Sequence, residues 1–495
     1  MNRSLPIVLH CADTLVNKVR YVFDTLFMAA GIPVVYYSKA PASGPWILYG
    51  GFNEPFANSS RCLAIAHCPE SWRFLEGAME IRGSVQVDGL DVLFPESSRG
   101  PWPVSQIRVD LVANAFYFLS SWYERFGADA DNQRCLYSNS LYARFKIPQD
   151  IVDQYLVRLL GRLAALCERL SLPPWAALEW PENRHYALVL SHDVDYIPEN
   201  RVAIVKQALK TVLRHLFRHH DPDDALRAAI GALGALVRNR DPYGCVHEII
   251  AREIELGTRS SFQVAVGRRD PRDVNYLIED DNVRDYLRAI PDAGFDLCLH
   301  GSCRSTENPT WYLEEAALLA DRLGAPMGSR QHFLSFDYDG LFAVQEQAGI
   351  QYDMSMGYPD QCGPRAGFSF PYFPYSVHED RPYDVLQINL FLMDVTLRSY
   401  LRQKPPRAWE SIQAVLDDLK RKRGCVSVVW HPIVFGGARD PGYDSLYWRM
   451  IEYTGSTGGL TTDGKSINTF WRSYAKNYMS FSDKTFQTLQ AGASR

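Results

Sequence analysis

The residues best placed to do chemistry are Ser191-His192-Asp193-Val194-Asp195, which directly follow an apolar run at 187–190. A short apolar run that ends in ionisable residues is typical of a buried strand whose end opens into a site. Two carboxylates two residues apart, with a histidine beside them, can hold a divalent cation and leave one group free as a base. The alternative is a helix N-cap with surface acids after a strand.

Strand-like and helix-like segments alternate from about residue 185 onward. We predict strands at 187–190, 262–266, 295–299, 385–390 and 426–430, with weaker candidates around Ser329 and Tyr352. Helical segments are predicted between them at 282–293, 311–323, 341–349 and 408–422. Repeated β–α units predict a parallel sheet or a barrel.

Ionisable residues follow nearly every predicted strand. In β/α barrels the active site forms where the strands end, so these residues are expected to converge. The strand ends supply His192, Asp193, Asp195, His300, Arg330, His332, Asp353, Asp394 and His431. One histidine after a strand is more often a packed or capping residue than a ligand, but a series of such positions favours a shared site.

The N-terminal part has the pattern of a separate α/β unit. Helices are predicted at 17–30, 111–126 and 148–172, and a strand at 32–37. Pro173-Pro174 ends the last of these helices. We therefore predict an N-terminal α/β domain of unknown role at 1–178 and a second domain at 179–495.

Composition sets broad limits on the function. The chain has 495 residues, with 52 basic and 57 acidic residues and a net charge of -5, which gives no electrostatic reason to expect nucleic acid. Its ten cysteines form no C-x-x-C pair, which favours a reducing compartment. The N-terminus is a poor signal peptide and no run is long enough to span a bilayer. We expect a cytoplasmic protein that could still visit a membrane surface. The basic segment 201–240 could touch an anionic surface, although a solvated helix pair is the favoured interpretation.

The region from His185 to the C-terminus resembles the polysaccharide deacetylase (NodB-homology) family. The matching motifs, in order, are Asp193-Val194-Asp195, His300-Gly301-Ser302, Arg330-Gln331-His332-Phe333 and Val428-Val429-Trp430-His431. The chain is more closely similar to a subgroup with a His-Asp-Val-Asp motif and an uncharacterised N-terminal domain, often encoded with capsule or lipopolysaccharide genes. Arg365-Ala366-Gly367 also fits that subgroup.

This resemblance implies an α/β fold with a distorted (β/α)7-type barrel after the N-terminal domain. It also implies a metal-dependent hydrolase that removes an N-acetyl group from an amino sugar or glycan, with a divalent ion, commonly zinc. Asp193 would be the general base, and Asp195 and His300 metal ligands. Arg330 would keep Asp193 ionised and oriented, and His431 would protonate the departing amine.

The sequence departs from the family pattern at Arg304, where a second metal-binding histidine is usual. Arginine stays protonated and cannot ligate a metal, and a catalytic zinc site normally has three protein ligands. His332 is our candidate for the third ligand, and a substrate hydrogen-bond donor is its alternative role. His192 is a weaker candidate, because alternation along an extended segment points it away from Asp193.

Substrate contacts are expected from Arg365, Tyr372 and Asp394. Tyr372 belongs to the aromatic segment 367–375, which could stack on sugar rings or form an ordinary hydrophobic loop. Two other functions stay open: a catalytically degenerate barrel that binds carbohydrate, and an amidohydrolase acting on a non-sugar amide.

Overall fold

The computed structural model describes residues 3–52, 57, 59–77, 81–95, 103–126, 136–197, 201–217, 220–237, 241–476 and 478. The chain divides into two compact units. The first unit comprises Met1–Glu179, Ala366–Asp384 and Thr469–Arg495, and the second comprises Trp180–Arg365 and Val385–Asn468. The first unit is thus built from three separate stretches of chain, whereas the division predicted from the sequence is contiguous.

A parallel five-stranded sheet forms the centre of the first unit, in the order β2-β1-β3-β4-β7. Its strands are β1 (Leu5–Leu9), β2 (Val34–Tyr37), β3 (Trp46–Gly50), β4 (Cys62–Ala66) and β7 (Gln106–Ile107). Beside it lie the helices α1 (Val16–Ala29), α2 (Leu111–Leu119), α3 (Trp122–Phe126), α4 (Leu141–Phe145) and α5 (Ile151–Arg169). Two hairpins complete it, β5 (Val85–Val87) with β6 (Leu90–Val92), and β13 (Tyr375–Ser376) with β14 (Arg381–Pro382). β3 and β4 are buried throughout, as is typical of parallel strands.

The prediction of one helix over 111–126 is wrong. The structure has two helices there, α2 and α3, separated at Ser120 and Ser121. Ser121 has a φ of 49°, in the left-handed region, which a right-handed helix cannot contain. The apolar pattern continues through this break because both helices bury aromatic side chains.

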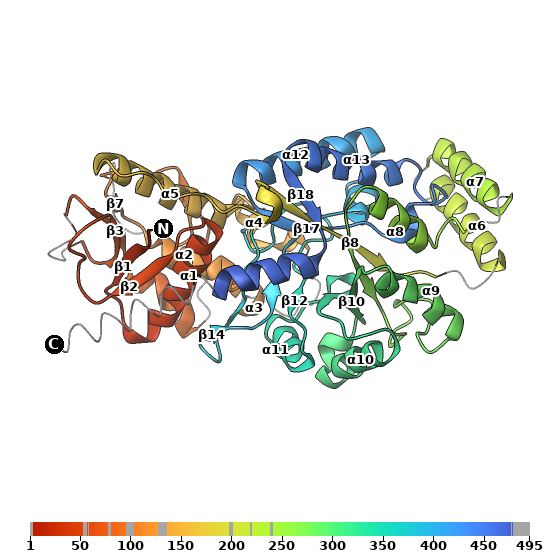
Figure 1. Cartoon of the computed structure of the whole chain (residues 1–495), viewed down its shortest axis with the longest axis horizontal. Coiled ribbons are helices and arrows are strands. Elements are labelled where there is room, and N and C mark those ends of the chain that lie inside the picture. The colour runs from red at the N-terminus through yellow and green to blue at the C-terminus, as the bar shows by residue number, and fades with distance from the viewer. Residues whose placement is uncertain are drawn as a thin grey trace. The chain divides into compact units, whose positions relative to one another are not determined.

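The second unit is built on eight parallel strands in the order β15-β12-β11-β10-β9-β8-β17-β16. Figure 1 labels β8, β10, β12 and β17 among them. They are β8 (Tyr186–Val194), β9 (Ser261–Val264), β10 (Asp296–Gly301), β11 (Gly328–Gln331), β12 (Tyr352–Asp353), β15 (Leu386–Gln387), β16 (Leu390–Met393) and β17 (Cys425–Val429). A further strand that the sequence did not reveal, β18 (Gly459–Thr462), pairs with the first half of β8. The predicted α/β class with a distorted (β/α) barrel is confirmed, in the form of a curled parallel sheet in which eight strands follow this order.

The two edges of this sheet are brought together by the chain itself. β15 and β16 are the outer strands, and only Ile388 and Asn389 lie between them. The Ile388 N–H donates to the Asp353 carbonyl (2.9 Å), and the Ser427 N–H donates to the Asn389 carbonyl (2.8 Å). Residues 388–389 therefore bridge the two edges of the sheet. As a result, the carboxyl ends of the strands surround one opening, the mouth of the barrel.

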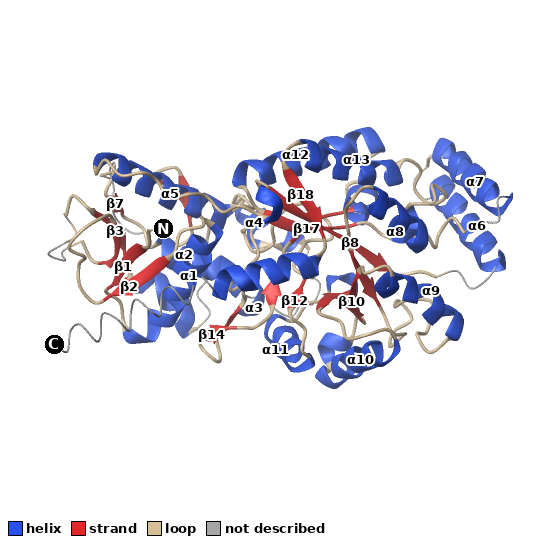
Figure 2. Cartoon of the chain, viewed as in Figure 1, coloured by secondary structure: helices blue, strands red, loops and turns tan. Residues whose placement is uncertain are grey.

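Helices cover the outside of this sheet (Figure 2). Those expected from the sequence are α9 (Asp281–Asp292), α10 (Pro309–Arg322), α11 (Tyr338–Ala348) and α12 (Pro405–Lys422), and those not expected are α8 (Val246–Glu255) and α13 (Tyr443–Ser456). A buried cluster that includes Leu190, Leu416, Val428 and Met450 joins β8 and β17 to α12 and α13. The basic segment forms a hairpin of α6 (Arg201–Phe217) and α7 (Pro222–Val237). Among the described residues, no helix combines the length and apolar character needed to cross a membrane.

Candidate metal centre and active site

The carboxyl ends of the central strands bring the ionisable residues of the second unit together. β8 is buried over all nine of its residues and delivers Asp193 and then Asp195 to this edge. The parallel register places His300 of β10 directly beside Arg330 of β11, and His332 follows two residues later. Strand pairing therefore gathers residues that are up to 139 positions apart in the sequence, from Asp193 to His332.

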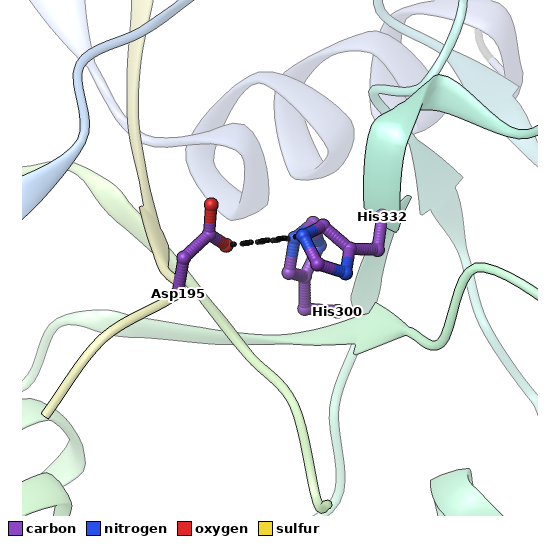
Figure 3. Close-up of side chains that lie close together, drawn as sticks. All are labelled: Asp195, His300 and His332. Atoms are coloured by element: carbon purple, nitrogen blue, oxygen red, sulfur yellow. Dashed lines mark ion pairs between the residues drawn. The ribbon is translucent and has the colours of Figure 1, made fainter. Parts of the chain in front are cut away.

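Asp195, His300 and His332 form a cluster with the donor set of a metal site (Figure 3). One ligand atom from each lies within 4.8 Å of the other two. Nε2 of His300 is 3.3 Å and Nε2 of His332 is 3.8 Å from Oδ1 of Asp195. Ligand atoms about 2.1 Å from a tetrahedral ion are about 3.4 Å apart, so these spacings suit one ion.

The hydrogen bonds of His300 and His332 engage Nδ1 of each ring and leave Nε2 available for a cation. Nδ1 of His300 lies 2.9 Å from the Arg330 carbonyl, which can only accept, so this nitrogen carries the proton. Nδ1 of His332 lies 3.2 Å from Oδ1 of Asp273. Such contacts fix the ring and leave the lone pair of Nε2 for a metal.

The buried atoms of the cluster need a positive charge between them. Within the described part of the chain, Asp195 Oδ1 and His300 Nε2 are both buried without a hydrogen-bond partner. Two unshared acceptors this close repel each other unless a proton or a cation lies between them. Two imidazoles and one carboxylate are also a usual catalytic zinc set that keeps a position open. The residues present therefore fit a divalent cation.

Electrostatics at this cluster favour positive charge. Burial opposes ionisation of Asp195, but the nearby His332, His300 and His431 outweigh it and lower the pKa of Asp195 well below its usual range. Burial likewise opposes protonation of His300, but Asp193 and Asp195 raise its pKa. The Asp195 side chain is 32% exposed, whereas that of His300 is buried, so the cluster is reached from solvent at its Asp195 side.

Asp193 is held as a carboxylate next to the cluster. Its Oδ1 accepts a hydrogen bond from Nη1 of Arg330 at 2.6 Å, and Arg330 is fully buried. A second bond, from Nε of Arg330 to the Met354 carbonyl (2.9 Å), fixes the guanidinium. Burial raises the pKa of Asp193, but the charge of Arg330, with His300 and His431, exceeds this effect, and the net pKa is lowered. Asp193 can therefore accept a proton at neutral pH.

His431 also lies next to Asp195. Its Nε2 lies 3.5 Å from Oδ2 of Asp195, and its Nδ1 lies 2.6 Å from Oδ1 of Asp394. Burial lowers the pKa of His431, but Asp394 outweighs this and raises it to about 9. Arg398 donates to Oδ2 of Asp394 at 3.2 Å. The imidazole is thus oriented and kept protonated, as an acid requires.

Asp394, expected from the sequence to contact substrate, lies against His431 and Arg398. It is fully buried, and its two oxygens are engaged by His431 and Arg398. Burial opposes its ionisation, but His431 and Arg398 lower its pKa to about 2. Its carboxylate therefore orients His431, and its role as a substrate contact stays a prediction.

Tyr372 and Arg365 lie in different units. Tyr372 is fully buried in the first unit, near Phe368, and presents no ring face for stacking on a sugar. The segment around it matches the hydrophobic-loop alternative. Arg365 is 5% exposed in the second unit, with its guanidinium over the rings of Phe336 and Tyr358, and its role as a substrate contact stays a prediction.

His192 and Arg304 are directed away from the cluster. Nδ1 of His192 contacts the Trp430 carbonyl (2.6 Å), and its Nε2 contacts Glu253 (3.0 Å) and the Tyr447 hydroxyl (3.2 Å). Arg304 is 44% exposed and pairs with Glu307 at 2.8 Å. Neither side chain is a ligand in this arrangement.

Asp273 is the site residue that the sequence did not reveal. Besides contacting His332, its Oδ1 accepts from the Cys303 N–H (3.0 Å), and its Oδ2 accepts from the N–H groups of Arg269 and Asp270 (3.1 and 2.9 Å). It lies in the loop between β9 and α9, where no periodic pattern marks it. Asp273 lies nine residues beyond the end of β9, so neither a strand end nor a motif drew attention to it.

Comparisons with known proteins find similar solved structures but no similar sequence. No protein-family model and no curated protein matches the sequence. The chain is similar to a protein assigned as a polysaccharide deacetylase from Mycobacterium smegmatis, with a TM-score of 0.41, 16% identity, and 61% of this chain and 95% of that chain covered. It is also similar to PuuE allantoinase, with a TM-score of 0.40, 16% identity and coverage of 59% and 92%.

A third similar structure is assigned as a polysaccharide deacetylase from Pseudomonas aeruginosa PAO1, with a TM-score of 0.39, 14% identity and coverage of 59% and 93%. The fold assignment itself rests on the strand order and pairing described above.

Proposed function

We propose that the protein is a metal-dependent amide hydrolase that removes an N-acetyl group from an amino sugar or glycan. The observation that carries this proposal is the convergence of three metal donors, Asp195, His300 and His332, between an ionised Asp193 and a protonated His431. A base, an acid and a cation site on one strand edge are the groups that hydrolysis of an unactivated amide needs. The sugar as substrate comes from the motif resemblance.

Asp195, His300 and His332 would hold the cation, and zinc suits this donor set. When bound, a divalent ion there supplies Lewis acidity that favours ionisation of water and polarises the amide carbonyl.

The residues of the chain itself move the protons. Asp193, kept ionised by Arg330, accepts a proton from the attacking water through Oδ2, the oxygen that Arg330 leaves free. His431 donates the proton on Nε2 to the departing nitrogen, which would otherwise be a poor leaving group. Asp394 holds the ring of His431 in the orientation that this transfer needs.

The test combines metal content with product formation. The purified protein should hold close to one zinc per chain by mass spectrometry and release acetate from an oligosaccharide of N-acetylglucosamine. His332→Ala should lose most of the metal and the activity together. A wild-type protein that takes up no zinc, even after incubation, would refute the hydrolase and favour a degenerate barrel that binds carbohydrate. If the protein binds zinc and hydrolyses a non-sugar amide but not the N-acetylated sugar, amide hydrolysis would stand as the reaction and the sugar would be excluded as the substrate.

A further inference from the structure

The helical hairpin α6–α7 of the second unit carries an exposed apolar face that no part of the proposed chemistry uses. On α6 it consists of Val202, Val205, Leu209, Leu213 and Leu216, between 39% and 62% exposed. On α7 it consists of Leu226, Ile230, Leu233 and Val237, between 61% and 80% exposed. Steps of three and four residues place each set in one stripe along its helix.

These stripes are additional to the faces that hold the hairpin on the unit. Ile204 and Ala208 of α6, and Ala232 and Leu236 of α7, pack against the main buried cluster of the second unit. Each helix thus has one apolar face against the protein and another in solvent. The two helices lie side by side (Figure 1). Single exposed leucines are ordinary, but a stripe of exposed apolar residues along each of two neighbouring helices indicates a contact surface.

The charge of the hairpin region identifies what this surface would contact. Segment 201–240 contains eight basic and three acidic residues, although the whole chain has a net charge of -5. Lys206 and Lys210 are exposed and lie one turn apart beside the α6 stripe. Two of the acids, Asp221 and Asp224, face Lys404 elsewhere in the same unit. Exposed lysines bordering leucine and isoleucine are typical of a surface that binds an anionic bilayer.

We propose that the α6–α7 hairpin docks the protein on anionic phospholipid membranes. The apolar stripes enter the boundary between headgroups and acyl chains, and the lysines contact lipid phosphates. This proposal does not depend on the hydrolase activity.

A chain of ion pairs joins the hairpin to the residues that orient His431. Arg214 of α6 pairs with Asp440 at 3.1 Å, Asp440 pairs with Arg398 at 3.1 Å, and Arg398 contacts Asp394, which holds His431. These ion pairs fix the hairpin at the strand edge that carries the site.

The experiment is sedimentation of the full chain with vesicles. We expect binding to vesicles of equal parts phosphatidylcholine and phosphatidylglycerol, weaker binding as salt is added, and little binding to phosphatidylcholine alone. Leu209→Asp with Ile230→Asp should abolish binding. Lys206→Gln with Lys210→Gln should lower the partition coefficient about 25-fold, since each lysine contributes about fivefold. Val157→Asp on α5 is the matched control, because Val157 is also an exposed helical valine (62%) and should bind as the wild type does.

Three results would overturn the proposal. The first is failure of the wild type to sediment with the anionic vesicles, and the second is unchanged binding by both double variants. The third is a wild-type protein that does not bind vesicles but forms a dimer by light scattering, which Leu209→Asp with Ile230→Asp dissociates. A second copy of the chain would then cover this face. Circular dichroism confirms folding, and the lysine variant gives an independent answer if the aspartate variant does not fold.

Discussion

Three histidines at the site share one arrangement, in which Nδ1 is held by the protein and Nε2 faces Asp195. The partner of Nδ1 decides what each histidine can do. His300 donates to a backbone carbonyl, which fixes its tautomer for ligation, while His431 is bound to the buried carboxylate of Asp394, which favours its protonated form. Equivalent residue types at neighbouring strand ends therefore acquire different roles.

The role of Asp193 as a base can be tested by Asp193→Asn. An amide cannot accept the proton from water, so kcat should fall by about two to four orders of magnitude. Zinc content should stay near the wild-type level because Asp193 is not in the donor set. Asp292→Asn, at the exposed end of α9, is the control and should leave kcat unchanged. Retention of most activity by Asp193→Asn would assign the base elsewhere.

Asp394→Asn tests the positioning of His431 by a pH profile. His431 must be protonated to act as an acid, so activity falls as the pH rises through its pKa. Asp394 raises that pKa, and its removal should move the alkaline limb of kcat to lower pH, with KM little changed. An alkaline limb at the wild-type position would show that His431 is not the acid whose titration limits kcat.

Strand β11 shows how one element fixes the geometry of several site residues. It carries Arg330 within the strand and His332 directly after it, and it packs closely on β12 at Gly328. A Cβ at Gly328 would come within 2.2 Å of the Tyr352 ring. The hydroxyl of that ring is bonded to the buried Asp296, so the ring has little freedom to move.

Gly328→Ala should accordingly destabilise the protein by about 1–3 kcal/mol, through overpacking, and disturb Arg330 and His332 together. Urea denaturation measures the first effect and zinc content the second. Gly455→Ala on α13 is the matched control, because nothing lies within 4 Å of its Cβ position and alanine favours a helix. Equal stability of the two variants would show that Tyr352 can move aside.

At the scale of the whole molecule, a cation held by residues from several strand ends should raise the free energy of unfolding. A ligand that binds only the folded state stabilises it by about 2.7 kcal/mol at a hundred times its Kd. We expect zinc to raise the Tm of the wild type and of Arg304→Gln, whose side chain is turned to Glu307, but not of His332→Ala. The shift should shrink as the pH falls, since protonation of His300, whose pKa is raised, competes with the metal. A Tm increase in His332→Ala equal to that of the wild type would remove His332 from the ligand set.

The sequence by itself determined the α/β class of the second unit and the edge at which its site residues meet. Apolar runs such as 187–190 indicate buried strands. The carboxyl ends of parallel strands lie at one edge of the sheet for any conformation of the loops. His332 could also be proposed as a third ligand, because the sequence alone shows that it follows a predicted strand, two residues after Arg330.

Only the tertiary structure decided which partner each polar side chain takes. Asp273 reaches His332, Asp394 reaches His431, and Arg304 turns to Glu307, none of which a periodic pattern encodes. Similarly, the break at Ser121 and the burial of Tyr372 depend on packing. Strand and helix patterns depend on residues that are close in the sequence. Hydrogen bonds and burial depend on residues that only the folded chain brings together.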